Sequence, residues 1–289
     1  VHKPSPFTPL TGIKIGELLK DVFPKGVFNV VAGDDKLPFN VGAHLSQHAK
    51  VNMVSFTGSV ATGKKVMANS SVNGMRRFNV EAGGNDAGIV LPDCDPKEVA
   101  PGLFGGAFAN SGQICCALKR CYVHESIHDQ VVEELVKCAK KAKFGDGFSD
   151  GTEFGPLNNK MQFDKVMNYI EDTKKVPGAK FECGGKKMDG LTGYFIEPTI
   201  VTGVKEGCRL VDEEQFGPVM PIIKYSDVED AVRRANESSY GLGGSVWSKD
   251  EEKAAAIASR IQAGTVWINA HTPLTGGPFG GFKQSGIGR

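Results

Sequence analysis

The sequence predicts an α/β protein built on parallel β-sheet. Apolar segments typical of strands alternate with amphipathic segments typical of helices along nearly the whole chain. Such repetition favours parallel strands with helices on the faces of the sheet. The pattern restarts after Glu81, and 289 residues are enough for one large domain or two ordinary ones. We therefore expect two successive α/β parts with a boundary at Gly83-Gly84.

The first part contains two short helix–strand repeats. Apolar residues on roughly one helical face predict a helix over 9–22 that Pro24 ends, and the segment VFNVV predicts a buried strand over 27–31. The second repeat consists of a helix near 38–46, a strand over 53–56, a glycine-bearing turn and a helix from about residue 60.

The second part is longer and follows the same alternation. Asp95 and Pro96 form an N-cap and first-turn signal for a helix over 95–109. The other expected helices cover 127–143, 160–175, 227–237 and 251–261, and the expected strands cover 88–91, 120–124, 218–224, 244–247 and 265–269.

Composition excludes several classes of protein. Lys plus Arg is 34 and Asp plus Glu is 33, a balance that predicts neither a nucleic-acid nor a membrane partner. No apolar run approaches the ~20 residues of a membrane span, and the opening VHKPSPFTPL has no signal-peptide or transit-peptide pattern. The seven cysteines contain no CxxC pair, so we expect no metal site and reduced thiols in a cytoplasmic compartment.

The segment FTGSVATG, residues 56–63, joins a strand to a helix. The N-terminus of that helix would present free N–H groups to a phosphate, and Gly58 would allow close approach. An ordinary glycine turn is the alternative, and the segment differs from the GxGxxG fingerprint of dinucleotide-binding folds.

Two further segments carry reactive side chains. Glu81 ends a strand in EAGGNDAGIV, where it could act as a general base or lie as a surface carboxylate before a turn. Cys115 and Cys116 follow Gly112-Gln113 in FANSGQICCALKR, as a candidate nucleophile and its neighbour or as two small buried apolar residues. His124 and His128 are interpreted as solvated surface, so activation of Cys115 would need a carboxylate or a bound cofactor.

Together with EEQFGPVMP (213–221) and GPFGGFKQSGIGR (277–289), these segments resemble the aldehyde dehydrogenase superfamily in order and spacing. FGPL (154–157), GYFIEPT (193–199) and QAGTVWIN (262–269) match as well, so the resemblance covers essentially the whole chain. It implies a Rossmann-like, parallel-sheet cofactor domain, of which residues 1–83 are the second half, and an α/β catalytic domain over 84–289. It also implies NAD or NADP as cofactor, a small-molecule aldehyde as substrate, and a homo-oligomer, dimer or tetramer, in the intact protein.

The resemblance assigns roles to individual residues. Cys115 is similar to the family's nucleophile, which forms a thiohemiacetal and then a thioester, and Glu81 to the base that activates water. Glu214 and Phe216 are similar to residues that hold the nicotinamide-side ribose, and Lys3 to one that binds the adenine-side ribose. The positions implied in cofactor binding are Lys3, Ser5, Pro6, Gly33, Phe56, Thr57, Gly58, Ser59, Gly63, Glu81, Gly83, Glu214 and Phe216.

The chain departs from the family pattern in three ways. AGG follows Glu81 where LGG is usual, with Asn85 where Lys is common. Pro6 replaces the acidic residue of many NAD-preferring members, so we expect NADP to be accepted. The family's amino-terminal segment, with the Asn of its oxyanion hole, and its extreme carboxy-terminal segment have no counterpart, and we expect a piece of a longer protein.

Three functions follow from the pattern. The first is oxidation of an aldehyde to a carboxylic acid with NAD or NADP. The second is CoA-acylating aldehyde oxidation, against which an intact Glu81 argues because it would serve hydrolysis. The third is a non-catalytic, truncated member of the superfamily, against which the presence of both Cys115 and Glu81 argues.

Overall fold

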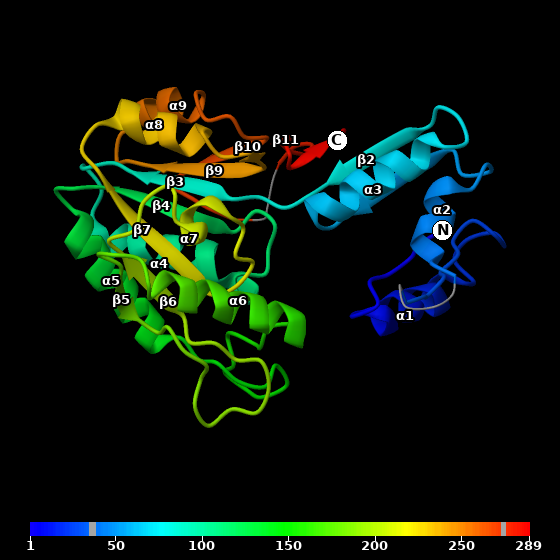
Figure 1. Ribbon diagram of the computed structural model, residues 1–289, viewed down its shortest axis with the longest axis horizontal. Coiled ribbons are helices and arrows are strands. Elements are labelled where there is room, and N and C mark those ends of the chain that lie inside the picture. Colours follow the sequence, from blue (N-terminus) through cyan, green and yellow to red (C-terminus); the bar gives the residue numbers. More distant parts are fainter. Residues whose placement is uncertain (35–38, 273–275) are drawn as a thin grey trace. The chain divides into compact units, whose positions relative to one another are not determined.

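The structure, a computed structural model, describes residues 1–34, 39–272 and 276–289. It confirms the α/β class (Figure 1). The chain divides into two compact units, Val1–Val80 with Gly288 and Glu81–Ile287 with Arg289. The division therefore falls just before Glu81 rather than at Gly83-Gly84, and the assignment of cofactor and catalytic roles to the two parts remains a prediction.

The first unit is small and largely helical. Its elements are α1 (Pro9–Leu19), α2 (Val41–Gln47), β1 (Met53–Thr57), α3 (Val60–Ser71) and β2 (Arg77–Glu81), whose last residue opens the second unit. Asn40 and Ser59 cap α2 and α3 through their side chains, which explains where both helices begin. The expected helix near 38–46 is thus α2, with position 38 outside the described residues.

Two expectations for this unit are wrong. No strand forms over 27–31: Val30 makes only an isolated bridge to His2, and Val27 is 61% exposed. A buried strand needs a neighbour that pairs along its length, which this segment lacks in the described part of the chain. Helix α1 ends at Leu19, before the expected residue 22, and its Leu10 and Leu18 are exposed rather than buried.

The second unit is built on a seven-stranded sheet in the order β10-β9-β3-β4-β7-β6-β5, parallel except for β5. Its strands are β3 (Asp86–Val90), β4 (Leu118–His124), β5 (Lys180–Cys183), β6 (Thr199–Thr202), β7 (Val219–Tyr225), β9 (Gly243–Trp247) and β10 (Thr265–Ile268). The sequence pattern did not reveal β5 and β6, which have only four residues each. Two further short strands, β8 (Tyr240–Gly241) and β11 (Phe282–Lys283), form an antiparallel pair, and β12 (Gly286–Ile287) is a two-residue strand.

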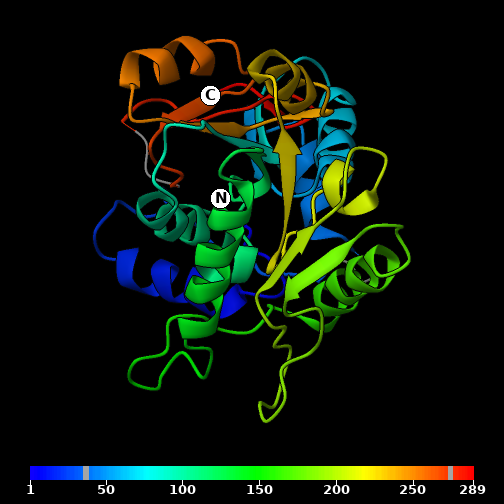
Figure 2. The ribbon, with the colours of Figure 1, turned by 90° about the vertical axis from the view of Figure 1, so that its left-hand side faces the viewer.

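Helices cover both faces of this sheet. They are α4 (Pro96–Phe108), α5 (His128–Lys141), α6 (Lys160–Thr173), α7 (Arg209–Asp212), α8 (Val228–Asn236) and α9 (Glu251–Ala258), with the short 3-10 helix η1 (Ala109–Gly112). Along β3, Ile89 packs with α6, α8 and α9, whereas Val90 packs with α4 and α5, as the alternation of a strand requires. Figure 2 shows α8 and α9, in gold and orange at the top, on the side of the strands away from the green α5.

Parallel pairing gathers three loops at one edge of the sheet. β3 lies beside β4 with Asp86 opposite Leu118, and β4 lies beside β7 with Cys121 opposite Ile222. The residues that precede these strands are therefore neighbours, although they are far apart in sequence. Helix α4, which Asp95 caps as expected, leads into the middle of these loops, the one that precedes β4.

A core substitution tests this packing. Leu103 of α4 is fully buried, so we expect Leu103→Ala to lower the free energy of unfolding by ~2–5 kcal/mol, from lost burial and a residual cavity. Both tryptophans, Trp247 and Trp267, lie in the second unit, so urea denaturation followed by their fluorescence reports on it. Met161→Ala is the control because Met161 is 69% exposed and should change stability by less than ~0.5 kcal/mol. Equal effects of the two substitutions would contradict the packing described.

Candidate active site

The loop that carries Cys115 begins with a sharp turn after α4. Asn110, Ser111 and Gly112 adopt positive φ angles of 51°, 55° and 73° in succession. A Cβ on Gly112 would lie 2.3 Å from the carbonyl oxygen of Gly217, in the loop before β7. Only glycine allows this approach, which brings the Cys115 loop against the loop that carries Glu214.

The two adjacent thiols differ in environment. Cys115 is partly accessible, whereas Cys116 is buried. The Cys116 thiol donates to the Cys115 sulfur and the Lys119 ammonium lies nearby, so the pKa of Cys115 is lowered although burial opposes this. The same contact, together with burial, raises the pKa of Cys116. Of the pair, Cys115 is therefore the one that ionises first and can act as a nucleophile.

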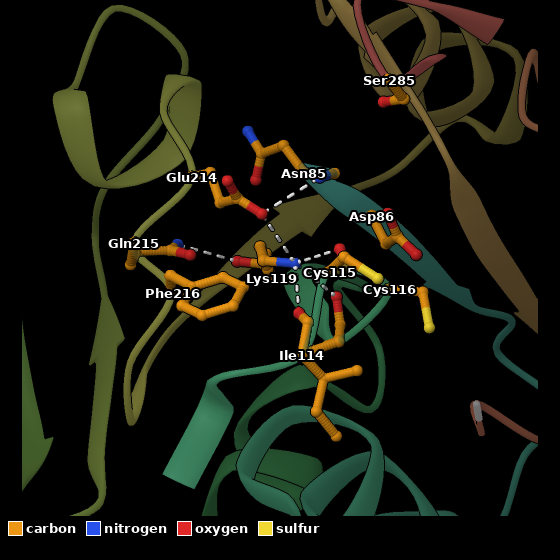
Figure 3. A network of polar contacts seen from close by, with 12 residues as sticks. Asn85, Asp86, Ile114, Cys115, Cys116, Lys119, Glu214, Gln215, Phe216 and Ser285 are labelled. Carbon is orange, nitrogen blue, oxygen red and sulfur yellow. Dashed lines mark hydrogen bonds and ion pairs between the residues drawn. The ribbon is translucent and has the colours of Figure 1, made fainter. Parts of the chain in front are cut away.

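Lys119, which sequence reasoning did not select, lies at the centre of the site (Figure 3). Its side chain is 3% exposed, and its ammonium donates to the carbonyl oxygens of Ile114 at 3.0 Å and Cys115 at 2.6 Å. It also lies 3.6 Å from a carboxylate oxygen of Glu214. A buried charge is tolerated only with such partners, so the network fixes the loop.

The Gly83-Gly84 backbone holds the Glu214 side chain, and α6 holds the segment that carries it. Its Oε1 accepts the Gly84 N–H at 3.0 Å, and a Cβ on Gly83 would lie 2.1 Å from its Oε2. Gln162 of α6 donates to the carbonyl oxygen of Phe216 at 2.8 Å, and Phe216 itself has a φ of 54°. The structure thus brings Gly84, Glu214 and the Cys115 backbone into one network through Lys119, with Gly83 packed against the Glu214 carboxylate.

Glu81 stands apart from that network. In the described part of the chain it shares no hydrogen bond or ion pair with Cys115, and its Oε2 is buried without a hydrogen-bond partner. Burial raises the pKa of Glu81, with Arg289 acting in the opposite direction. A carboxyl group with a raised pKa and an unused oxygen is suited to exchange a proton near neutral pH.

A buried polar cluster lies behind Cys116. His271 Nε2 is 3.0 Å from the Cys116 carbonyl oxygen and 3.8 Å from Asp86 Oδ2, and its Nδ1 is 2.9 Å from Ser245 Oγ. Burial lowers the pKa of His271 to about 3 and raises that of Asp86 to about 7. A neutral His271 therefore donates from Nε2 to Cys116 and accepts at Nδ1.

The structure corrects the interpretation of the histidines. His271 lies next to Cys116, 155 residues away in sequence, so spacing alone gave no signal of it. His128, expected on the solvated surface, is 3% exposed and bonds to Asp129 at 2.7 Å. It belongs to the amphipathic face of α5, whose apolar spacing could have indicated burial.

The predicted cofactor residues of the first unit lie at the end of β1, at the start of α3 and near the amino end of the chain. Ser59 accepts the Thr62 N–H at 3.2 Å, and Phe56 lies over Gly58, where a Cβ would be 2.5 Å from the ring. A Cβ on Gly63 of α3 would lie 2.9 Å from the Val80 side chain of β2, so close packing favours glycine there. Three of the remaining positions are at the start of the unit: Lys3 donates to the Pro4 carbonyl oxygen at 3.0 Å, Ser5 accepts the Phe7 N–H, and Pro6 is exposed. Further along the chain, Gly33 packs on Val41 and Thr57 ends β1.

Neither a metal-binding cluster nor a membrane-spanning helix is found within residues 1–34, 39–272 and 276–289. No group of three or more His, Cys, Asp and Glu side chains there is arranged to hold a metal ion. No helix in those ranges is long and apolar enough to cross a membrane.

A partly accessible thiol of lowered pKa, set in an α/β unit, is typical of enzymes that work through a covalent cysteine intermediate. The model of the aldehyde dehydrogenase family matches residues 1–289, and the chain belongs to that family. It is 42% identical to human retinaldehyde dehydrogenase 3 and to betaine aldehyde dehydrogenase from Bacillus subtilis, over its full length in both cases. It covers 56% and 59% of those proteins, so it spans a little over half of their length.

Solved structures agree with this assignment. Betaine aldehyde dehydrogenase from Staphylococcus aureus, in complex with NAD⁺, superposes with a TM-score of 0.94 at 40% identity, over 99% of this chain and 57% of that one. An aldehyde dehydrogenase from Bacillus cereus gives a TM-score of 0.94 at 41% identity, over 100% of this chain and 58% of that one. The fold implied by the resemblance is therefore shown.

Alkylation with iodoacetamide tests the thiol assignment. Cys115 should be labelled first, and its rate should stay high as the pH falls below ~8.5, the pKa of an ordinary thiol, because its thiolate is stabilised. Peptide mapping across pH measures this, with urea-unfolded protein as the reference. Cys138 and Cys183 are internal controls, because burial raises their pKa. Earlier labelling of Cys116 or of these thiols would refute the assignment.

Proposed function

We propose that the protein containing this chain oxidises an aldehyde to a carboxylic acid, with NAD or NADP as hydride acceptor and Cys115 as nucleophile. The observation that carries the proposal is the Cys115 loop, where a partly accessible thiol is held beside a thiol donor and a buried ammonium. Family membership over residues 1–289 supports the reaction class.

Each chemical step has a residue suited to it. The Cys115 thiolate attacks the aldehyde carbon and forms a thiohemiacetal, and loss of hydride from that carbon leaves a thioester. The nicotinamide, when bound, accepts the hydride. Glu81 then removes a proton from water, which attacks the thioester and releases the acid and the Cys115 thiol. Its raised pKa and its unpartnered Oε2 fit that task.

The residues present fit a dinucleotide. Glu214 uses Oε1 on the Gly84 N–H and has Oε2 left to accept a ribose hydroxyl. The 12-residue helix α3 begins at Ser59 with no acidic residue in its first turn, which suits an anionic phosphate group. Lys3, Ser5, Pro6, Gly33 and the 56–59 turn complete the set that the resemblance assigns to cofactor binding.

The remaining expectations join this proposal. The intact protein would be a homo-oligomer located in the cytoplasm. The CoA-acylating alternative differs in its acyl acceptor, because CoA would replace water, and product analysis with and without CoA separates the two. A non-catalytic member would form no acyl-enzyme, so a stoichiometric burst of NADH or NADPH would exclude it.

Substitution of the base tests the order of steps. In the intact protein, Glu81→Gln should leave the burst of NADH or NADPH largely intact and slow the steady state by ~10²–10⁴-fold, because water activation is lost while hydride transfer is not. Rapid-mixing absorbance at the reduced cofactor's band measures both phases. Glu98→Gln, at an exposed first-turn position of α4, is the control. Unchanged turnover in Glu81→Gln would remove Glu81 from the mechanism.

Cofactor choice gives a second test. An acidic side chain at position 6 would repel a 2′-phosphate and accept hydrogen bonds from the ribose, whereas Pro6 can do neither. We therefore expect NADP to be accepted, and Pro6→Glu to shift preference towards NAD. The values of kcat/KM for both cofactors measure this. A wild-type preference for NAD of a hundredfold, ~2.7 kcal/mol in transition-state binding, would contradict the expectation.

A further inference from the structure

Lys119 is a buried cation whose hydrogen bonds go to backbone carbonyl oxygens of the Cys115 loop. Its ammonium donates to the carbonyl oxygens of Ile114 and Cys115, and the Ala117 carbonyl oxygen lies at 3.5 Å. On its other side is Glu214 at 3.6 Å. Removing an ammonium from water is costly, so this arrangement persists only because the partners are well placed.

These contacts fix the orientation of two consecutive peptide groups. A trans peptide points its N–H opposite to its C=O, and the described residues contain no cis peptide bond. Holding the Ile114 and Cys115 carbonyls towards Lys119 therefore turns the N–H groups of Cys115 and Cys116 away from it. The Cys116 N–H faces the Cys115 sulfur, and the Cys115 N–H donates to no backbone carbonyl within residues 39–272.

The charge of Lys119 acts on the same sulfur. The groups that face Cys115 are the Cys116 thiol and N–H, the Lys119 ammonium, and the carboxyl groups of Glu214 and Asp86. The ammonium favours the thiolate, and the two carboxyl groups oppose it when ionised. Lys119 is the only cation in this set.

We propose that Lys119 is a positioning residue for the nucleophile, which orients the Cys115 loop through two carbonyl groups and stabilises the Cys115 thiolate by its charge. The inference rests on the proposed function, in which Cys115 attacks the aldehyde. It extends that function by naming the cation that, together with the Cys116 thiol, favours the Cys115 thiolate, in place of the histidine of a Cys–His pair. His271 cannot take that role, because it bonds to the Cys116 backbone and is neutral.

The experiment compares the pH dependence of Cys115 alkylation by iodoacetamide, an uncharged probe, in variants of the intact protein without cofactor. Lys119→Met keeps a long, unbranched side chain but removes the positive charge and the hydrogen-bond donors. We expect its midpoint to rise by about one pH unit, so that the alkylation rate at pH 7 falls about tenfold, since each unit is a tenfold change in thiolate fraction. Lys119→Arg keeps the charge and should return the midpoint most of the way to wild type.

Glu214→Gln gives a shift of opposite sign. Its carboxylate opposes ionisation of Cys115, so its removal should lower the midpoint. Lys283→Met is the matched control, because Lys283 also donates to two backbone carbonyls, those of Asn236 and Ser238, but in another loop. It should leave the midpoint unchanged. Circular dichroism and thermal melting establish that each variant is folded.

The outcomes separate the two proposals. Labelling of a thiol other than Cys115 in the wild-type protein overturns the proposed function. Labelling of Cys115 with the same midpoint in wild type and Lys119→Met overturns only the role of Lys119. If Lys119→Met does not fold, Glu214→Gln decides: a midpoint below that of wild type supports control of the Cys115 sulfur by the surrounding charges, and an unchanged midpoint overturns it.

Discussion

Parallel pairing of β3, β4 and β7 is the constraint on which the candidate site depends. It places Gly83–Asn85, the Cys115 loop and the Glu214–Phe216 segment at one edge, each immediately before its strand. Ligands of open α/β sheets usually bind beyond the carboxyl ends of the strands. In this unit the Cys115 thiol lies instead at the amino ends of the strands, and the loops that precede them carry the candidate site.

Close approach of these loops explains why glycine occupies several positions in them. Gly112 meets the Gly217 carbonyl, Gly83 meets the Glu214 carboxylate, and a Cβ on Gly84 would lie 2.7 Å from the Cys115 carbonyl oxygen. Any side chain at these positions would separate the loops. Gly83, Gly84 and Gly112 therefore serve the packing of the site as much as any approach of a cofactor.

Two adjacent cations hold the site through backbone carbonyls. Lys119 binds the Cys115 loop, while Arg120 is directed to the other side of β4, where it donates to the carbonyl oxygens of Asn85, Arg234 and Ala235. The alternation of a strand sends neighbouring side chains to opposite faces. The Cys115 loop and the C-terminal end of α8 are thus anchored to one strand, which gives the Cys115 thiol a rigid setting.

The sequence by itself determined the α/β class, the helix that begins at the Asp95 cap, and the identity of Cys115 and Glu81 as reactive candidates, because capping, periodicity and motif order are local properties of the chain. It did not reveal β5 and β6, whose four-residue length leaves no periodicity, and it predicted a strand over 27–31 that has no partner along its length. Only the tertiary structure decided that Lys119 faces Glu214 and that His271 contacts Cys116. These contacts join residues 95 and 155 positions apart, and they depend on strand order and on which face each side chain takes, which no short segment encodes.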